Sequence, residues 1–212
     1  MRDAGTALLV LVPALLAGVR ASAQPVEHAE HEERAWSFGA SFSWYFLRDQ
    51  PDLGVVTATA DHGPIHLEAR YNYEALDTGS VWAGYNLAGG ETLAWTLTPM
   101  VGAVFGDTEG VAPGYRGSLG WKRFELYSEG EYLIDTGTAA SNFMYTWSEL
   151  TFAPVEQIRF GVVIQRTRAY DTDLDIQRGL LLGVNLKRFQ FTATIFNLDE
   201  SPVVAVSAGI GF

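Results

Sequence analysis

The chain ends on Val203-Val-Ala-Val-Ser-Ala-Gly-Ile-Gly-Phe212, and this stretch decides how the rest of the sequence is interpreted. Counting back from Phe212, every second side chain is apolar, and the residues between them are mostly small. Strict alternation with a period of two predicts a β-strand with one apolar face. Ten residues is also the length that a tilted strand needs to cross a bilayer. The stretch is therefore either a membrane-crossing strand or the edge strand of a soluble β-sandwich.

The segment Ile65–Tyr73 separates these two interpretations. Its odd-numbered residues are apolar or aromatic, and between them lie His66, Glu68, Arg70 and Asn72. Four successive polar side chains on one face of a strand would need extensive pairing in a dry sandwich core. The water-filled interior of a membrane barrel accepts them readily. We therefore predict an all-β fold: a closed antiparallel up-and-down transmembrane β-barrel, with apolar faces toward lipid and polar faces inward.

Alternating segments divide residues 36–212 into about twelve strands, although counts of ten to fourteen also fit. The expected strands are Trp36–Leu47, Leu53–Asp61, Ile65–Tyr73, Ser80–Leu87, Thr92–Gly106, one ending at Trp121, Phe124–Leu133, Phe143–Ala153, Ile158–Thr167, Asp175–Leu186, Phe189–Asn197 and the terminal stretch. An even number places both termini in the periplasm, with tight turns there and longer acidic loops outside. In Phe143–Ala153 the two halves are out of phase. Either Phe143, Tyr145 and Trp147 or Leu150 and Phe152 face lipid, and a β-bulge near Ser148 would reconcile them.

The terminal strand, ending on an aromatic residue, resembles the C-terminal strand of Gram-negative outer-membrane β-barrel proteins. In that family the terminal aromatic pattern is an assembly signal. The resemblance covers residues 36–212 and implies that Phe212 is recognised by the barrel-assembly machinery. It also implies a location in the bacterial outer membrane, in contact with the lipid bilayer and lipopolysaccharide.

The N-terminus carries an export signal. Residues 1–23 combine Arg2, an apolar core from Ala7 to Ala17, and an Ala21-Ser-Ala23 cleavage site, as in a secretory signal peptide. Residues 24–35 are acidic and lack periodicity, which indicates a solvated periplasmic tail. His28 and His31 among the glutamates of this tail form only a weak metal-binding pattern, and no metal site or cofactor is expected.

Composition excludes several classes of function. The formal net charge is −11, and removal of residues 1–23 makes it −12, because they hold two arginines and one aspartate. A chain without a basic face is not expected to bind nucleic acid. With no cysteine, neither a disulfide framework nor a thiolate site is available.

The expected interior suggests a passage for solutes. The predicted pore-lining charged residues and histidine are His66, Glu68, Arg70, Arg116, Glu125, Glu129 and Glu131. Facing acids and arginines create a field across a narrow pore, and an excess of acid favours cations. The predicted function is a porin-like passive channel for small hydrophilic solutes with a mild cation preference. The alternative is a structural or surface-interaction barrel in which these groups pair and fill the interior, as side chains do in eight-stranded barrels.

Three arginines form a second candidate site, at the outer rim of the barrel. Arg166, Arg168 and Arg178 are expected on the lipid side at the outer ends of neighbouring strands, where they can hold lipopolysaccharide phosphates. Pairing with the aspartates of the same hairpin is the alternative.

A lipid-modifying enzyme is a third possible class of function, but no histidine of residues 36–212 is expected at the outer lipid-facing rim, where its catalytic base would lie. No enzymatic activity is therefore expected.

Overall fold

The computed structural model describes residues 35–47, 51–137, 142–169, 175–199 and 202–212. The predicted signal peptide and nearly all of the predicted periplasmic tail lie outside these ranges, as does the side chain of Arg168. In the described residues, no helix has the length and hydropathy needed to cross a membrane.

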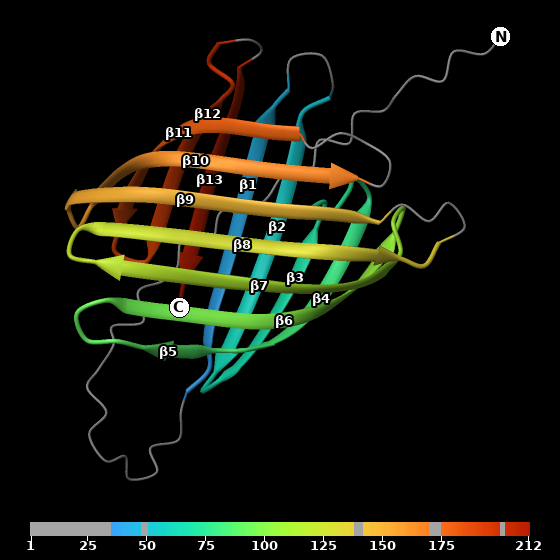
Figure 1. Ribbon diagram of the computed structural model, residues 1–212, viewed down its shortest axis with the longest axis horizontal. Coiled ribbons are helices and arrows are strands. Elements are labelled where there is room, and N and C mark those ends of the chain that lie inside the picture. The colour runs from blue at the N-terminus through green and yellow to red at the C-terminus, as the bar shows by residue number, and fades with distance from the viewer. Residues whose placement is uncertain (1–34, 48–50, 138–141, 170–174, 200–201) are drawn as a thin grey trace.

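The described residues form one antiparallel sheet of thirteen strands. Their bounds are β1 Ser37–Phe46, β2 Leu53–His62, β3 Ile65–Tyr71, β4 Thr78–Tyr85, β5 Leu87–Gly89, β6 Ala94–Gly106, β7 Gly110–Trp121, β8 Phe124–Asp135, β9 Phe143–Val155, β10 Ile158–Ala169, β11 Asp175–Leu186, β12 Phe189–Phe196 and β13 Val203–Gly211. Consecutive strands pair with each other except β4 and β5. β13 pairs with β1 and β4 pairs with β6, which closes the sheet into a barrel (Figure 1).

The wall of the barrel has twelve strand positions, because β4 and β5 occupy one position in line. Both pair with β6: β4 from Thr78 to Gly84, and β5 from Leu87 to Gly89. Between them the amide of Asn86 donates to the carbonyl of Pro64, so the chain leaves the β6 ladder there. The predicted closed twelve-strand barrel is thus confirmed. The predicted strand Ser80–Leu87 is corrected to β4, which ends at Tyr85, followed by the short β5.

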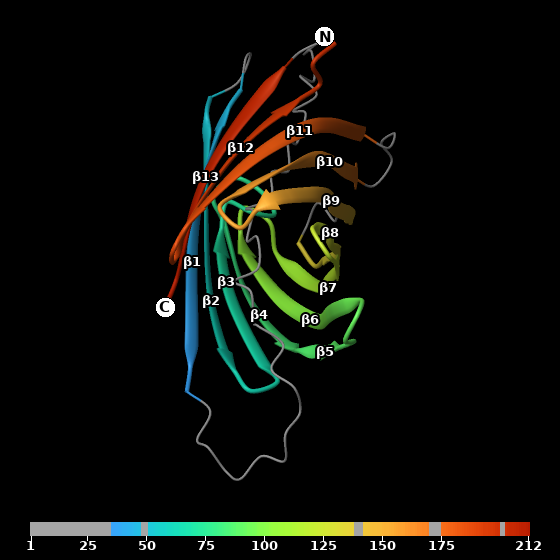
Figure 2. The same ribbon diagram turned by 90° about the vertical axis from the view of Figure 1, so that its left-hand side faces the viewer.

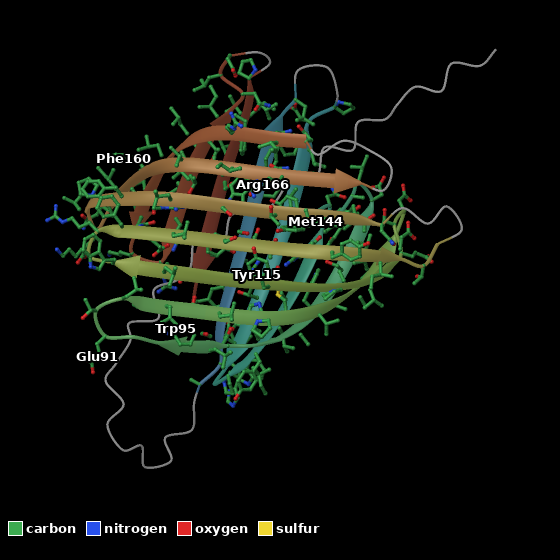
Figure 3. The ribbon with its side chains drawn as sticks, in the orientation of Figure 1. Glu91, Trp95, Tyr115, Met144, Phe160 and Arg166 are labelled. Atoms are coloured by element: carbon green, nitrogen blue, oxygen red, sulfur yellow. The ribbon has the colours of Figure 1, made fainter. Side chains whose placement is uncertain are left out.

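The two faces of the wall differ as the alternation predicts. Large apolar side chains are exposed on the outer surface around the whole barrel, as Trp95, Tyr115, Met144 and Phe160 illustrate (Figure 3). The inward residues of the same strands are mostly polar, charged or small. Exposed apolar residues at this density would be unstable in water but suit a hydrocarbon environment. This outer surface is the lipid-facing wall.

The ends of the chain meet at the seam between β1 and β13. The amide of Phe38 donates to the carbonyl of Phe212 at 2.7 Å, the Phe212 amide donates back at 2.9 Å, and the two rings stack. The terminal stretch therefore completes the barrel, and the side chain of Phe212 remains exposed.

Strand β9 corrects the predicted bulge near Ser148. The β8–β9 pairing runs in unbroken register from Leu133–Phe143 to Phe124–Phe152. Tyr145 and Trp147 are consequently buried inside the barrel, while Leu150 faces lipid. The two sets were out of phase because they lie on opposite faces of one regular strand. Inward aromatic residues are compatible with a barrel whose interior is packed rather than fully water-filled.

Candidate functional site: the charged side of the barrel interior

The middle of the barrel interior is filled by side chains from every wall position. Each of the twelve positions contributes at least one inward side chain that is buried, as in Ser43, Thr57, Arg70, Trp82, Met100, Ala112, Glu129, Trp147, Val163, Leu181, Thr194 and Ala205. Barrels of eight strands are filled and those of sixteen leave an aqueous channel. This twelve-strand barrel has a packed middle section.

The packing divides the interior into two sides. From β9 through β13 to β2 the inward residues at mid-height are largely apolar or uncharged, and Trp147 on β9 meets Phe196 on β12 edge to face. On the other side, acids and arginines project inward from β3, β7 and β8, and β4 and β6 between them contribute uncharged residues such as Ser80, Trp82 and Met100. β3 and β8 face each other across the interior (Figure 2). The charged side is therefore the candidate site.

Arg70 on β3 is the centre of this charged side. Its Nη1 donates to Glu131 on β8 at 2.7 Å, and its Nε donates to Glu68 on its own strand. β4, β6 and β7 separate β3 from β8, so the Arg70–Glu131 contact crosses the interior. The guanidinium also lies between two rings, 4.0 Å from the centre of Tyr73 and 4.3 Å from that of Trp82. Such cation–π contacts are strongest where water is excluded.

A second arginine makes a parallel bridge. Nη1 of Arg116 on β7 lies 2.7 Å from Glu68, and its Nε lies 3.4 Å from Glu129 on β8. Glu68 thus receives two guanidinium groups and is fully buried. The Arg116–Glu68 pair joins β7 to β3, which are not neighbours in the sheet, whereas Glu129 is the cross-strand partner of Arg116 on the neighbouring β8.

Residues 72–77, between β3 and β4, fold into the interior instead of outward. Asn72 and Asp77 adopt positive φ angles, and the Asn72 amide donates to the Thr78 carbonyl at 2.8 Å. The side-chain amide of Asn72 donates to the Gly54 carbonyl and so fixes the fold to β2. Asparagine is among the residues that tolerate the left-handed region. The predicted strand Ile65–Tyr73 therefore ends at Tyr71.

This inward fold brings two buried side chains to the arginines. The Tyr73 hydroxyl donates to Glu129 at 2.6 Å. Glu74 accepts from the Ser80 hydroxyl at 2.6 Å and lies 3.5 Å from Arg70 Nη1. The segment thus narrows the interior beside the charged cluster.

The six members of what we term the lumen cluster are Glu68, Arg70, Glu74, Arg116, Glu129 and Glu131. His66 and Asp61 adjoin it on the periplasmic side. The two nitrogens of His66 lie 2.8 Å from Asp61 and 3.2 Å from Glu68. Both nitrogens can donate only in the imidazolium form.

A separate pair lies on the other side of the interior. Arg159 on β10 donates to Glu149 on β9 at 3.1 Å and to Thr192 on β12 at 3.0 Å. Neither charged residue was among the sequence candidates, although both are on inward positions of predicted strands. Glu74 was also missed, because its inward position depends on the turn at Asn72, which alternation does not signal.

The structure brings six of the seven predicted interior residues together: His66, Glu68, Arg70, Arg116, Glu129 and Glu131. Glu125 lies apart, half-buried near the β7–β8 turn and opposite Thr151. Counted over the described residues, the buried or half-buried inward positions hold three arginines, Arg70, Arg116 and Arg159. They hold eight carboxylates, Asp61, Glu68, Glu74, Glu125, Glu129, Glu131, Asp135 and Glu149. The interior is therefore acidic overall.

At the outer rim, Arg166 on β10 and Arg178 on β11 are exposed on the lipid-facing surface. Arg166 pairs with Ile176 and Arg178 pairs with Ile164, so the two arginines are diagonal neighbours. Among the described residues neither arginine has an ion-pair partner, Asp175 included. Arg168 follows on the same strand, but its side chain is outside the described set.

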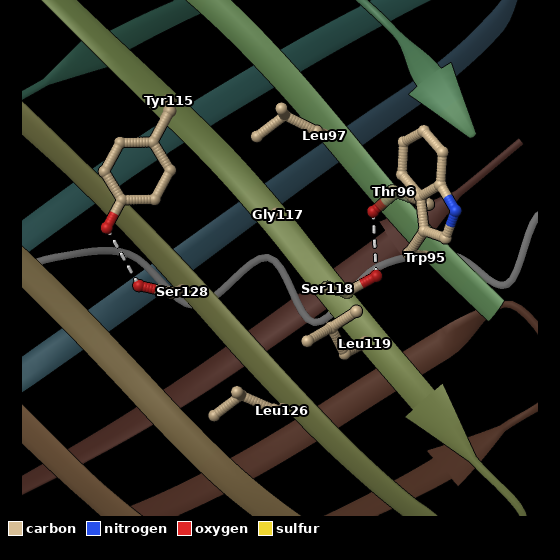
Figure 4. A pocket seen from close by; sticks show the side chains of 9 residues that line it. All are labelled: Trp95, Thr96, Leu97, Tyr115, Gly117, Ser118, Leu119, Leu126 and Ser128. Carbon is tan, nitrogen blue, oxygen red and sulfur yellow. Dashed lines mark hydrogen bonds between the residues drawn. The ribbon is translucent and has the colours of Figure 1, made fainter. Parts of the chain in front are cut away.

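A shallow hollow lies on the outer wall, away from the charged interior. It measures about 300 Å³ and is bordered by Trp95, Leu97, Tyr115, Leu119 and Leu126, with Gly117 at its floor (Figure 4). Tyr115 donates to or accepts from Ser128 at 3.0 Å within it. Its apolar border makes it part of the lipid-facing surface.

Neither described histidine is placed for nucleophilic catalysis. His66 contacts two carboxylates, and His62 stacks on Trp36 at 4.9 Å between ring centres. A serine nucleophile needs a base within hydrogen-bond reach. The described residues show no serine–histidine contact of this kind.

Comparison with known proteins identifies the fold. No protein-family model and no curated protein sequence matches the chain. Among solved structures, the KdgM porin aligns with a TM-score of 0.60 at 11% identity, over 82% of this chain and 99% of that one. The KdgM porin in complex with disordered oligogalacturonate aligns with a TM-score of 0.58 at 11% identity, over 83% and 99%. The outer-membrane protein Omp33 of Acinetobacter baumannii aligns over 85% and 99%, with a TM-score of 0.48 at 10% identity.

The two KdgM alignments, at 11% identity, show a similarity of fold, and they agree with the closed twelve-strand wall. The chain is a closed twelve-strand β-barrel with a porin-like fold and a lipid-facing outer wall.

Proposed function

We propose that the protein is a narrow passive channel for small hydrophilic solutes, with a mild preference for cations. The observation that carries this proposal is the acid excess inside the barrel, eight carboxylates against three arginines on buried or half-buried inward positions of the described residues. Rings of acidic side chains favour cations in narrow pores. The pathway runs along the charged side, past His66, Glu68, Arg70 and Arg116 and then Glu129 and Glu131, with Glu125 near its periplasmic mouth.

The same acid excess bears on the kind of solute. One neighbouring porin structure is described with oligogalacturonate, which is a chain of acidic sugars. A polyanion entering this interior would meet net negative charge in a space of low dielectric constant, where like charges repel strongly. We therefore assign neutral or cationic solutes to this barrel. It is proposed to act without enzymatic chemistry.

Planar-bilayer recording of the refolded protein tests the proposal. Single-channel current and a reversal potential displaced toward the cation are expected in a salt gradient. The double variant Glu129→Gln/Glu131→Gln should lower the cation preference, because it removes two carboxylates from the pathway. Unchanged selectivity in that variant would remove these residues from the filter.

A non-conducting barrel is the second candidate, and one observation favours it. All twelve wall positions bury at least one inward side chain, so side chains from every part of the wall take up space in the interior. Absence of current at every voltage in correctly refolded protein would leave this candidate ahead. A phospholipid hydrolysis assay on the same preparation checks the enzymatic alternative, and hydrolysis above the level of empty detergent would establish it.

The outer rim is proposed to bind lipopolysaccharide phosphates through Arg166 and Arg178, with Arg168 continuing the same strand. Two exposed guanidinium groups on adjacent strands are spaced for phosphate oxygens, which arginine binds in a bidentate manner. The variant Arg166→Gln/Arg178→Gln should bind lipopolysaccharide more weakly in a co-sedimentation assay. Equal binding by both proteins would refute the assignment.

Phe212 is proposed to be the residue that the barrel-assembly machinery recognises. Its backbone pairs with Phe38, while its side chain is among the most exposed apolar groups, at 64%. A ring that contributes little buried surface to the folded barrel is available to a partner during assembly.

A further inference from the structure

The lumen cluster carries more negative charge than its own arginines can neutralise. Glu68, Glu74, Glu129 and Glu131 face only Arg70 and Arg116. All six side chains are at most 11% exposed, so little water screens them. The adjoining His66 and Asp61 do not change this balance, because an imidazolium cancels one carboxylate. Burial of uncompensated charge is costly, and such groups are normally paired or coordinate an ion.

Three buried oxygens in this region have no hydrogen-bond partner in the structure. They are Glu74 Oε2, Glu131 Oε1 and the hydroxyl of Tyr145. Tyr145 lies directly opposite Glu131 in the β8–β9 ladder, with its side chain on the same inner face. The carboxylates of Glu74 and Glu131 both contact Nη1 of Arg70, at 3.5 and 2.7 Å. The rings of Tyr73 and Tyr145 meet edge to face, which brings residues 72–77 against β9.

We propose that Glu74, Glu131 and Tyr145 bind one monovalent metal cation, sodium or potassium. The ligands would be the two unpartnered carboxylate oxygens and the phenolic oxygen. A cation at this point supplies the missing positive charge and partners for the unsatisfied oxygens together. This inference deepens the proposed function, since it names the ion held in the pathway, and it rests on that function only for the site's role in permeation.

The donor set selects the class of ion. Among the described residues, no group of three or more His, Asp or Glu side chains is arranged as a metal-ligand set. Calcium takes six to eight oxygen ligands, and magnesium requires near-ideal octahedral geometry. Two carboxylates and one neutral hydroxyl suit a weakly bound ion of single charge. Weak binding is also what conduction requires of a site within a pathway.

Two other occupants make different predictions. A buried water molecule satisfies the three oxygens but brings no charge. A proton on either carboxylate removes one negative charge. Its effect on stability would depend on pH and not on which metal cation is present. The groups facing this point are Arg70 and Glu68 from β3, Ser80 and Trp82 from β4, Arg116 from β7, Glu129 from β8, and Tyr73 from the inward segment.

Thermal unfolding of the refolded barrel in detergent tests the site. The melting temperature is measured at constant ionic strength, with sodium or potassium chloride replaced stepwise by choline chloride, so that general screening stays the same. Above the dissociation constant of the cation, each tenfold rise in its concentration raises the folding equilibrium constant about tenfold. For a chain of this size we expect the melting temperature to rise by about 3–6 °C per tenfold step.

Three variants sharpen the test. Glu131→Gln should abolish the dependence on sodium and potassium, while Tyr145→Phe keeps the ring packing and should weaken it severalfold. Glu125→Gln removes a carboxylate outside the cluster and should preserve the wild-type dependence. Glu74→Gln replaces Glu131→Gln if the latter fails to refold.

Equal melting temperatures in sodium, potassium and choline for the wild-type protein would overturn the proposal in favour of water. A dependence on pH without any dependence on the cation would overturn it in favour of a proton. Both readouts are independent of current. A barrel that binds the cation but conducts nothing would refute the channel function alone, and a conducting barrel without cation dependence would refute the site alone.

Discussion

Replacement of Arg70 by glutamine is expected to be the most destabilising conservative change in the interior. Among the described residues, Arg70 is the only cationic side chain that contacts Glu131 and Glu74, and it shares Glu68 with Arg116. Its side chain is 1% exposed, and those of Glu68 and Glu131 are 0% and 2% exposed. Removal of one member of a buried ion pair typically costs about 3–5 kcal/mol, because the remaining charge is left without compensation. Loss of contact with the Tyr73 and Trp82 rings adds to this cost.

The measurement is equilibrium unfolding by urea of the protein refolded into lipid vesicles, followed by the fluorescence of its six tryptophans. We expect Arg70→Gln to lower the free energy of unfolding by about 3–5 kcal/mol. The matched control is Arg178→Gln, since Arg178 is exposed and has no ion-pair partner among the described residues, and it should change the value by less than about 0.5 kcal/mol.

A double-mutant cycle separates the ion pair from other effects of the substitution. Addition of Glu131→Gln to Arg70→Gln removes the uncompensated carboxylate, so the double variant should be more stable than Arg70→Gln alone. Coupling energies for contacting residues reach about 0.5–3 kcal/mol. If Arg70→Gln costs no more than Arg178→Gln, or if the second substitution restores nothing, the cross-lumen pair is not a source of stability and the reasoning fails.

Three further outcomes follow from the packing and the two faces of the wall. Gly102→Ala should destabilise the barrel by about 1–3 kcal/mol in the same urea assay, because its new methyl group would overlap the Trp82 ring. Gly120→Ala is the neutral control, because its methyl group would meet no atom nearer than 3.8 Å. Equal costs of the two substitutions would contradict the packing of Gly102 against Trp82. Val162→Lys places a charge on the lipid-facing surface of β10 and should cost about 2–4 kcal/mol in vesicles if it lies near the bilayer midplane; a neutral result would mean that this face is not in hydrocarbon. Phe212→Ser should reduce the folded protein recovered from outer membranes severalfold while refolding in detergent proceeds normally, and a parallel loss of both would assign Phe212 to stability instead of recognition.

The wall could be predicted from sequence because a single physical rule governs it. A residue such as Leu67 or Val101 must face hydrocarbon, and strict alternation then assigns its neighbours to the interior. The same rule fails for the interior. It states only that Tyr145 and Trp147 differ in phase from Leu150, and a prediction that both sets face lipid requires a bulge that the regular β8–β9 register does not have. Inward aromatic residues are stable here because the barrel is narrow enough for opposite walls to meet.

The lumen cluster exposes a second limit, since its contacts are long-range. Nothing local to Glu131 predicts Arg70 as its partner, because the two residues are 61 positions apart and three wall positions separate their strands. Glu74 enters the interior only because the chain turns at Asn72, whose side chain donates to Gly54 on β2. The sequence therefore predicted six of the charged or histidine side chains that meet inside the barrel and missed Glu74, while the pairing of all of them depends on barrel closure.

The pairing across the interior also constrains how such a barrel can work. The residues that would line the solute pathway are the same ones that join β3 to β7 and β8. The contacts that stabilise the barrel are therefore also the contacts that a passing solute would meet. Solutes can pass the charged side only when bridges such as Arg70–Glu131 yield, and each bridge that yields exposes a carboxylate to the solute. A passing cation compensates that carboxylate while a passing anion does not. In the channel that we propose, the barrier to movement would therefore be lower for cations than for anions, and selectivity would follow from how the interior is held together.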